Sequence, residues 1–103
     1  MLTSKDRAYL RGLAQNIDPV VQLGKGEIDE DVMFAINGVL DTRELIKISI
    51  LQNSELEPKV VADELTDCLK AQVVAVIGRK IVLYRKSTKK GVKHIEINGQ
   101  RKK

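Results

Sequence analysis

The chain has 103 residues, of which 43% are hydrophobic and 3% aromatic, and its formal net charge is +4. This length suits one domain with a single modest core, and one cysteine excludes an internal disulfide and favours a reducing compartment. The first residues, 1–6, lack the apolar core of a secretory signal, and the longest apolar run, residues 73–77, is too short to span a bilayer. We therefore expect a cytoplasmic protein without a membrane segment.

The charge is segregated along the chain. Residues 1–26 contain four basic and two acidic side chains, residues 27–78 four basic and eleven acidic, and residues 79–103 ten basic and one acidic. This pattern predicts a bipolar molecule with one side facing a polyanion. A solvated lysine-rich tail that aids solubility is the alternative, and we favour it for Lys102 and Lys103.

The first predicted element is a helix that starts at a capping box, Thr3 to Asp6, and ends before Asp18-Pro19. Apolar side chains recur on one face of this helix, and three cations lie outside that face. The apolar residues are Leu10, Leu13, Ala14 and Ile17, and the cations are Lys5, Arg7 and Arg11.

A short strand, Val20 to Leu23, leads into a Gly24-Lys25-Gly26 loop, and Asp29 is a good N-cap for the helix behind it. Glycines let the backbone approach a ligand closely, and the helix N-terminus and Lys25 suit an anion such as phosphate. A tight connection without a ligand is the competing interpretation. The helix is expected to bury one stripe and to leave Phe34 outside it. The stripe consists of Val32, Ala35, Ile36, Val39 and Leu40.

Residues 45–51 alternate as a strand that buries Ile46, Ile48 and Ile50, and Pro58 opens a third helix. That helix is expected to bury Val61, Leu65, Cys68 and Leu69, with Cys68 as a core thiol.

The nearly continuous apolar run 72–77 is typical of a central strand covered on both faces, and Gly78-Arg79-Lys80 turns it into strand 81–85. The order αβαβαββ predicts an α+β fold of two layers, with a mixed four-stranded sheet and the second and third helices on one face. The expected domain covers residues 1–86. Residues 87–103 are a basic tail, with one short edge strand at 94–97 as an option.

Catalytic constellations are missing from the sequence. His94 is the only histidine, and one histidine with one cysteine cannot make a Cys/His zinc site. Asp29 and Asp31 have the spacing that opens a calcium loop, but no further ligands follow. Glu27 stands where a nucleotide-binding P-loop has Ser or Thr. We therefore expect no enzyme activity, no metal or other cofactor and no small-molecule substrate.

Four segments together resemble the CRM domain, the chloroplast RNA splicing and ribosome maturation domain, over roughly residues 2–86. They are Leu13-Ala14, Pro19 to Gly26, Arg43 to Ile48 and Val76 to Arg85. In length the chain is similar to the stand-alone bacterial YhbY-like members. The resemblance implies a fold like the C-terminal domain of initiation factor three, a KH-like Gly-x-x-Gly loop, and binding of RNA in precursors of the large ribosomal subunit.

The family's Gly-x-x-Gly falls on Gly24, Lys25, Gly26 and Glu27, so glutamate replaces the last glycine. Either the loop still tracks the RNA backbone with Glu27 turned away, or other cations carry the binding. The further candidate contacts are Lys5, Arg7 and Arg11 on the first helix and Arg79, Lys80, Arg85 and Lys86 around the last hairpin. Because aromatic residues are few, we expect recognition of backbone and shape. Tyr84 is the one aromatic near this face, and a place in the core is equally expected for it.

A protein-interaction module is the alternative from another class. Its acidic middle would dock a basic ribosomal protein, with Met33 and Phe34 as an apolar contact. The acidic residues are Glu55, Glu57, Asp63, Glu64 and Asp67. In either case we expect a monomer.

Overall fold

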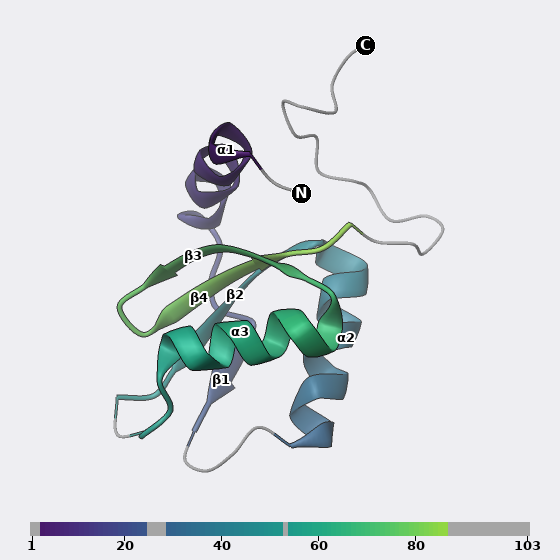
Figure 1. Ribbon diagram of the computed structural model, residues 1–103, viewed down its shortest axis with the longest axis vertical. Helices are drawn as coiled ribbons and strands as arrows, with labels where there is room; N and C mark the ends of the chain where they lie inside the picture. Colours follow the sequence, from purple (N-terminus) through teal and green to yellow (C-terminus); the bar gives the residue numbers. More distant parts are fainter. Residues whose placement is uncertain (1–2, 25–28, 53, 87–103) are drawn as a thin grey trace.

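The computed structural model describes residues 3–24, 29–52 and 54–86 and contains three helices and four strands within them (Figure 1). In chain order the elements are α1 (Ser4–Ala14), β1 (Val21–Leu23), α2 (Glu30–Arg43), β2 (Leu45–Ile50), α3 (Pro58–Leu69), β3 (Gln72–Ile77) and β4 (Lys80–Tyr84). The predicted order αβαβαββ and the α+β class are confirmed.

The strands form one mixed sheet in the order β1-β2-β4-β3. β1 runs parallel to β2, and β4 is antiparallel to both β2 and β3. The prediction that β3 is a central strand is wrong, because the tight turn at Gly78, where φ is +58°, folds β4 back between β2 and β3. The predicted coverage of β3 on both faces is correct and accounts for its apolar run, because its side chains pack against helices on both faces of the sheet.

Helices cover both faces of the sheet, so its layering differs from the expected two layers. α2 and α3 share one face, as predicted, over a core that includes Ile46, Ile48 and Leu83. α1 covers the opposite face, where Leu10 and Ala14 pack against a second cluster with Val82 and Tyr84 (Figure 1). The alternation of β4 side chains between the two clusters places the sheet between two helical layers.

Helix boundaries follow their capping signals. Thr3 Oγ1 accepts a hydrogen bond from the Asp6 amide, and Asp6 Oδ2 accepts one from the Thr3 amide, both at 3.1 Å. Asp29 Oδ1 accepts from the Val32 amide at 2.9 Å, and Pro58 occupies the first turn of α3. α1 ends at Ala14 and so does not include Ile17, which follows in a turn and still packs against the second cluster.

Three residues expected on buried faces lie at the surface. Leu13 is 37% exposed because the buried face of α1 is centred on Leu10 and Ala14. Cys68 is exposed because the buried face of α3 is centred on Leu65 and Leu69 and turns toward Ala62, away from position 68. Ala35 is exposed because only Ile36 and Leu40 of α2 are fully covered. Phe34 lies outside the stripe as predicted, and 80% of its surface is exposed. Among the described residues, no helix has the length and apolar character that crossing a membrane requires.

Candidate nucleic-acid interface

The predicted loop begins at the carboxyl ends of the two parallel strands. Gly24 follows β1, and a Cβ placed on it would lie 3.6 Å from the Leu51 side chain, an ordinary contact distance. The Leu51 amide donates to the Leu23 carbonyl at 2.9 Å, so the exits of β1 and β2 are tied together. Lys25, Gly26 and Glu27 lie outside the described residues, and their part in the site stays a prediction.

The β3–β4 turn lies at the same end of the sheet. Lys80 pairs with Ser49 of β2 and is exposed. The Arg79 side chain instead turns to the β2–α3 connection, where Nε donates to the Leu51 carbonyl at 3.2 Å and Nη2 to the Ser54 carbonyl at 2.9 Å. Arg79 thus braces the segment that borders Gly24, and its contact with RNA stays a prediction.

The remaining predicted cations lie at the other end of the sheet. Lys5, Arg7 and Arg11 are exposed on α1. Arg7 and Arg11 are neighbours at i and i+4 on one side of its buried face, whereas Lys5 lies on the other side. Lys86, just beyond β4, is also exposed.

Arg85 holds the two acidic helices together. Its Nη1 donates to Asn37 Oδ1 at 2.8 Å and to the Leu69 carbonyl at 2.7 Å. Its Nη2 donates to Asp41 Oδ1 at 2.8 Å in an ion pair and to the Asn37 carbonyl at 3.1 Å. This guanidinium therefore links α2 to α3, and a role of Arg85 in RNA binding remains a prediction.

The structure thus divides the candidate residues into two groups. Gly24, Arg79 and Lys80 lie at the end where β2 finishes. The buried face of α1 packs with Leu45 and Tyr84, so its cations lie toward the end where β2 begins, together with Arg85 and Lys86. Six residues of β2 separate the two ends, which corresponds to about 17 Å. That separation exceeds the reach of a single small ligand, so a ligand that contacts both groups would have to be extended.

Tyr84 belongs to the core. It is 4% exposed, and its hydroxyl has no hydrogen-bond partner within the described part of the chain. Burial raises the pKa of this hydroxyl above its usual 10.0, and the carboxylates of Glu44 and Asp6 raise the pKa further. This aromatic ring is therefore unavailable for stacking on a base.

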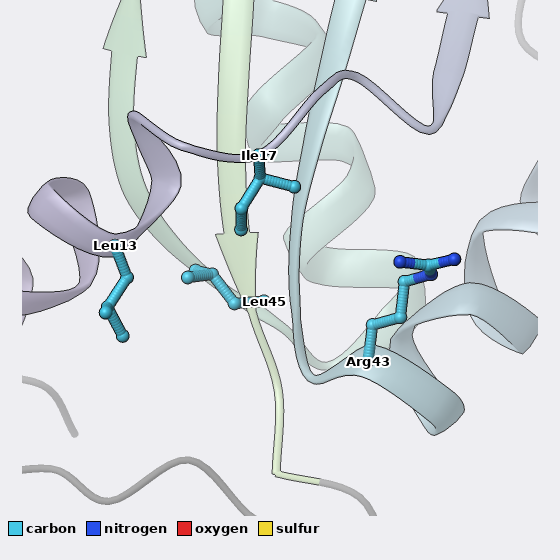
Figure 2. A pocket seen from close by; sticks show the side chains of 4 residues that line it. All are labelled: Leu13, Ile17, Arg43 and Leu45. Atoms are coloured by element: carbon cyan, nitrogen blue, oxygen red, sulfur yellow. The ribbon is translucent and has the colours of Figure 1, made fainter.

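A shallow pocket near α1 contains residues that sequence reasoning did not single out as functional. It is lined by Leu13, Ile17, Arg43 and Leu45 (Figure 2). Tyr9, one helical turn before Leu13, is 37% exposed, as is Leu13 itself. The four-residue spacing of Tyr9 and Leu13 could have shown from sequence that the two side chains are neighbours on one side of the helix. That Arg43 lies beside Leu13 depends on tertiary structure.

The described residues contain no group of three or more His, Cys, Asp or Glu side chains that could hold a metal ion.

Residues 2–85 match the family model described as the CRS1 / YhbY (CRM) domain. The chain belongs to this family. It is 41% identical over 97 residues to Probable RNA-binding protein YqeI of Bacillus subtilis (strain 168), which covers 94% of this chain and 99% of that protein. It is 34% identical over 86 residues to an RNA-binding protein of Haemophilus influenzae, with coverage of 84% and 87%.

The fold of this CRM domain agrees with a solved relative. The solution structure of a hypothetical protein from Staphylococcus aureus, described as a candidate RNA-binding protein, superimposes with a TM-score of 0.78 at 45% sequence identity. The match covers 94% of this chain and 99% of that chain. The family resemblance read from the sequence is thereby confirmed.

Proposed function

We propose that this CRM domain binds structured RNA without catalysing a reaction. The observation that carries the proposal is the placement of three exposed cations on α1, across the sheet from the acidic helices α2 and α3. A polyanion is attracted to the first surface and repelled by the second. The names of the B. subtilis and H. influenzae relatives support the same function.

The RNA we propose is ribosomal RNA in a precursor of the large subunit, as the family resemblance implies. In the proposed complex, Lys25 neutralises a phosphate while Gly24 and Gly26 allow close approach of the backbone. Lys80 extends this contact at the same end of the sheet, and Lys5, Arg7, Arg11 and Lys86 contact the RNA at the other end. Arg79 and Arg85 support the two ends from within.

The test is the affinity of the full chain for a large-subunit ribosomal RNA fragment over a salt titration. The logarithm of affinity is expected to fall with the logarithm of salt by about 0.7–0.9 per phosphate neutralised. Lys25→Ala is expected to lower both the affinity and this slope, whereas Glu27→Gly raises the affinity by removing an anion from the site. Lys59→Gln removes one exposed charge from α3 and is the matched control.

Gly24→Ala separates ligand approach from folding. Gly24 does not have the left-handed φ that requires glycine, and its added Cβ has room beside Leu51, so the stability should be unchanged. A lower RNA affinity in this variant would therefore report close approach of the RNA to the loop. Absence of binding by the wild-type chain at modest salt would refute the proposed function. Retained binding by both Lys25→Ala and Gly24→Ala would refute only the loop contact.

One observation favours a second candidate function, a protein-interaction module. Phe34 is 80% exposed on the outer side of α2, and the acidic residues Glu55, Glu57, Asp63, Glu64 and Asp67 are exposed on and before α3. A basic ribosomal protein would suit this surface. Loss of binding to such a protein on neutralising Asp63, Glu64 and Asp67, with RNA binding unaffected, would support this candidate.

A further inference from the structure

The pocket between α1 and the end of α2 combines an apolar floor with a cationic rim. Leu13 comes from α1, Ile17 from the turn after it and Leu45 from the first position of β2, and Arg43 stands opposite at the last position of α2 (Figure 2). Its volume of about 390 Å³ lies at the small end of the range for ligand pockets, roughly 300–1,000 Å³. The pocket therefore has room for a small planar group.

The pocket is built on fixed elements of the fold. Leu45, the first residue of β2, is buried on the face of the sheet that α1 covers, and it pairs with Tyr84 of β4. Glu44, which separates Leu45 from Arg43, is fully buried and takes a positive φ of 65°. That left-handed residue ends α2 sharply, so that Arg43 remains on the helix while Leu45 enters the sheet.

Two further side chains extend the pocket along α1. Tyr9 lies one turn before Leu13, and Lys5 lies one turn before Tyr9, all on the same side of the helix. Both Tyr9 and Lys5 are exposed. The surface therefore presents a cation, an aromatic ring, an apolar hollow and an arginine in sequence.

We infer that this pocket binds an unpaired base of the RNA, which is a contact beyond the phosphate-directed interface and rests on the proposed function. Unpaired bases are held by stacking on aromatic rings and arginine planes and by apolar contact, whereas paired bases are not accessible in this way. The base lies on Leu13, Ile17 and Leu45, the guanidinium of Arg43 stacks on it or contacts its phosphate, and Tyr9 stacks on the neighbouring base. Lys5 neutralises the adjoining backbone.

This site changes the kind of RNA that the protein selects. Contacts of α1 and of the Gly24 loop with phosphate favour any structured RNA equally. A base pocket adds preference for a helix interrupted by a loop or bulge, at a place about one strand length from the Gly24 loop.

The experiment compares two RNAs of equal length, a hairpin with an unpaired loop and a fully paired duplex, at one salt concentration with the full chain. Tyr9→Ala is expected to weaken hairpin binding by at least about fivefold and to leave duplex binding within about twofold, because stacking is lost but no charge is. Tyr9→Phe keeps the ring and should retain hairpin binding. Phe34→Ala, which removes the other exposed aromatic ring of the described chain from α2, is the matched control.

Arg43→Gln tests the rim in the same assay, with Lys59→Gln as its control for loss of charge. We expect Arg43→Gln to lower hairpin affinity more than duplex affinity, and Lys59→Gln to change neither. As an independent readout in the wild-type chain, added adenosine monophosphate should shift the methyl NMR signals of Leu13, Ile17 and Leu45. The signal of Leu56, in the connection before α3, should stay unchanged.

The outcomes distinguish this inference from the proposed function. If the wild-type chain binds neither RNA, both fail. If it binds both RNAs and Tyr9→Ala and Arg43→Gln bind the hairpin as tightly as the wild type, the base pocket alone is refuted. The base pocket would also be refuted if Tyr9→Ala weakened hairpin and duplex binding equally. It would likewise be refuted if Tyr9→Phe, which keeps the ring, lost hairpin binding as Tyr9→Ala does.

Discussion

The helices on the two faces of the sheet differ in charge and in what holds them in place. α1 carries three exposed cations and one buried acid, whereas α2 and α3 each carry three acidic residues and one basic residue. α1 is fixed by its capping box and by a small cluster around Leu10, while α2 and α3 share the larger core and the guanidinium of Arg85. The difference teaches that a cation predicted to lie at a binding surface can instead join helices of the fold, as Arg85 does for α2 and α3, while the cations of α1 are left exposed.

The largest expected effect is on the acidic layer. Arg85→Ala removes an ion pair and three further hydrogen bonds that join α2 to α3, so we expect the free energy of unfolding to fall by about 2–4 kcal/mol. Urea denaturation measures this change. Lys86→Ala removes the same charge from the next, exposed position and should change stability by less than about 0.5 kcal/mol. Equal stability of the two variants would show that the Arg85 contacts do not hold the layer.

Reversing the charge of the basic layer should affect binding more than folding. Arg7→Glu with Arg11→Glu is expected to lower RNA affinity at low salt by at least about tenfold and to reduce the salt slope by about 1.4–1.8, because two phosphate contacts are lost. The matched double variant Asp63→Lys with Asp67→Lys changes α3 by the same amount of charge. An effect of the α3 variant as large and in the same direction would show that the two faces do not differ in function.

Loss of the cap on α1 should have a smaller effect. Thr3→Ala removes the acceptor for the Asp6 amide and should destabilise the protein by about 1 kcal/mol. Ser4→Ala, at the adjacent exposed position, is the control. Hydrogen exchange of the α1 amides should increase in Thr3→Ala and not in Ser4→Ala. Unchanged exchange in Thr3→Ala would contradict the role of the capping box.

The smallest change in stability at neutral pH is expected from a substitution in the sheet itself, at Tyr84 of β4. The raised pKa of this hydroxyl means that the folded state binds its proton more tightly than the unfolded state. Its contribution to stability is therefore complete below about pH 10 and is lost as the pH rises through the higher folded-state pKa. Tyr84→Phe should match the wild type within about 0.5 kcal/mol at pH 7, since the hydroxyl has no hydrogen-bond partner in the described structure, and should lack the alkaline loss. The measurement is the free energy of unfolding of both proteins as the pH rises above neutral. An equal loss of stability in Tyr84→Phe and the wild type at alkaline pH would contradict the role of the Tyr84 hydroxyl.

Local signals in the sequence predicted most of the fold. Asp29 and Pro58 mark where α2 and α3 begin, and Gly78 marks the turn between β3 and β4. These boundaries could be predicted because each depends only on the backbone next to the residue. The position of β3 at the edge of the sheet could not be read locally, since a strand covered by helices on both faces is apolar whether it is central or not.

The candidate site was less predictable from sequence. An arginine in a basic segment has the same sequence signature whether it faces solvent or carbonyl groups, so the internal contacts of Arg79 and Arg85 emerge only from tertiary structure. The pocket is similar in this respect, because Leu13 and Arg43 are thirty positions apart in the chain and meet at the end of the sheet. The exposed cations of α1 were predictable, since helical spacing alone separates Lys5, Arg7 and Arg11 from the buried stripe.

The most direct measurement is NMR mapping of the full chain with a large-subunit ribosomal RNA fragment. We expect the largest amide shifts on α1, at Gly24 and at Lys80, while the exposed residues Asp63, Glu64 and Asp67 of α3 stay unchanged. Shifts concentrated on the outer sides of α2 and α3, with α1 unaffected, would contradict the assignment of RNA binding to the basic side of the molecule.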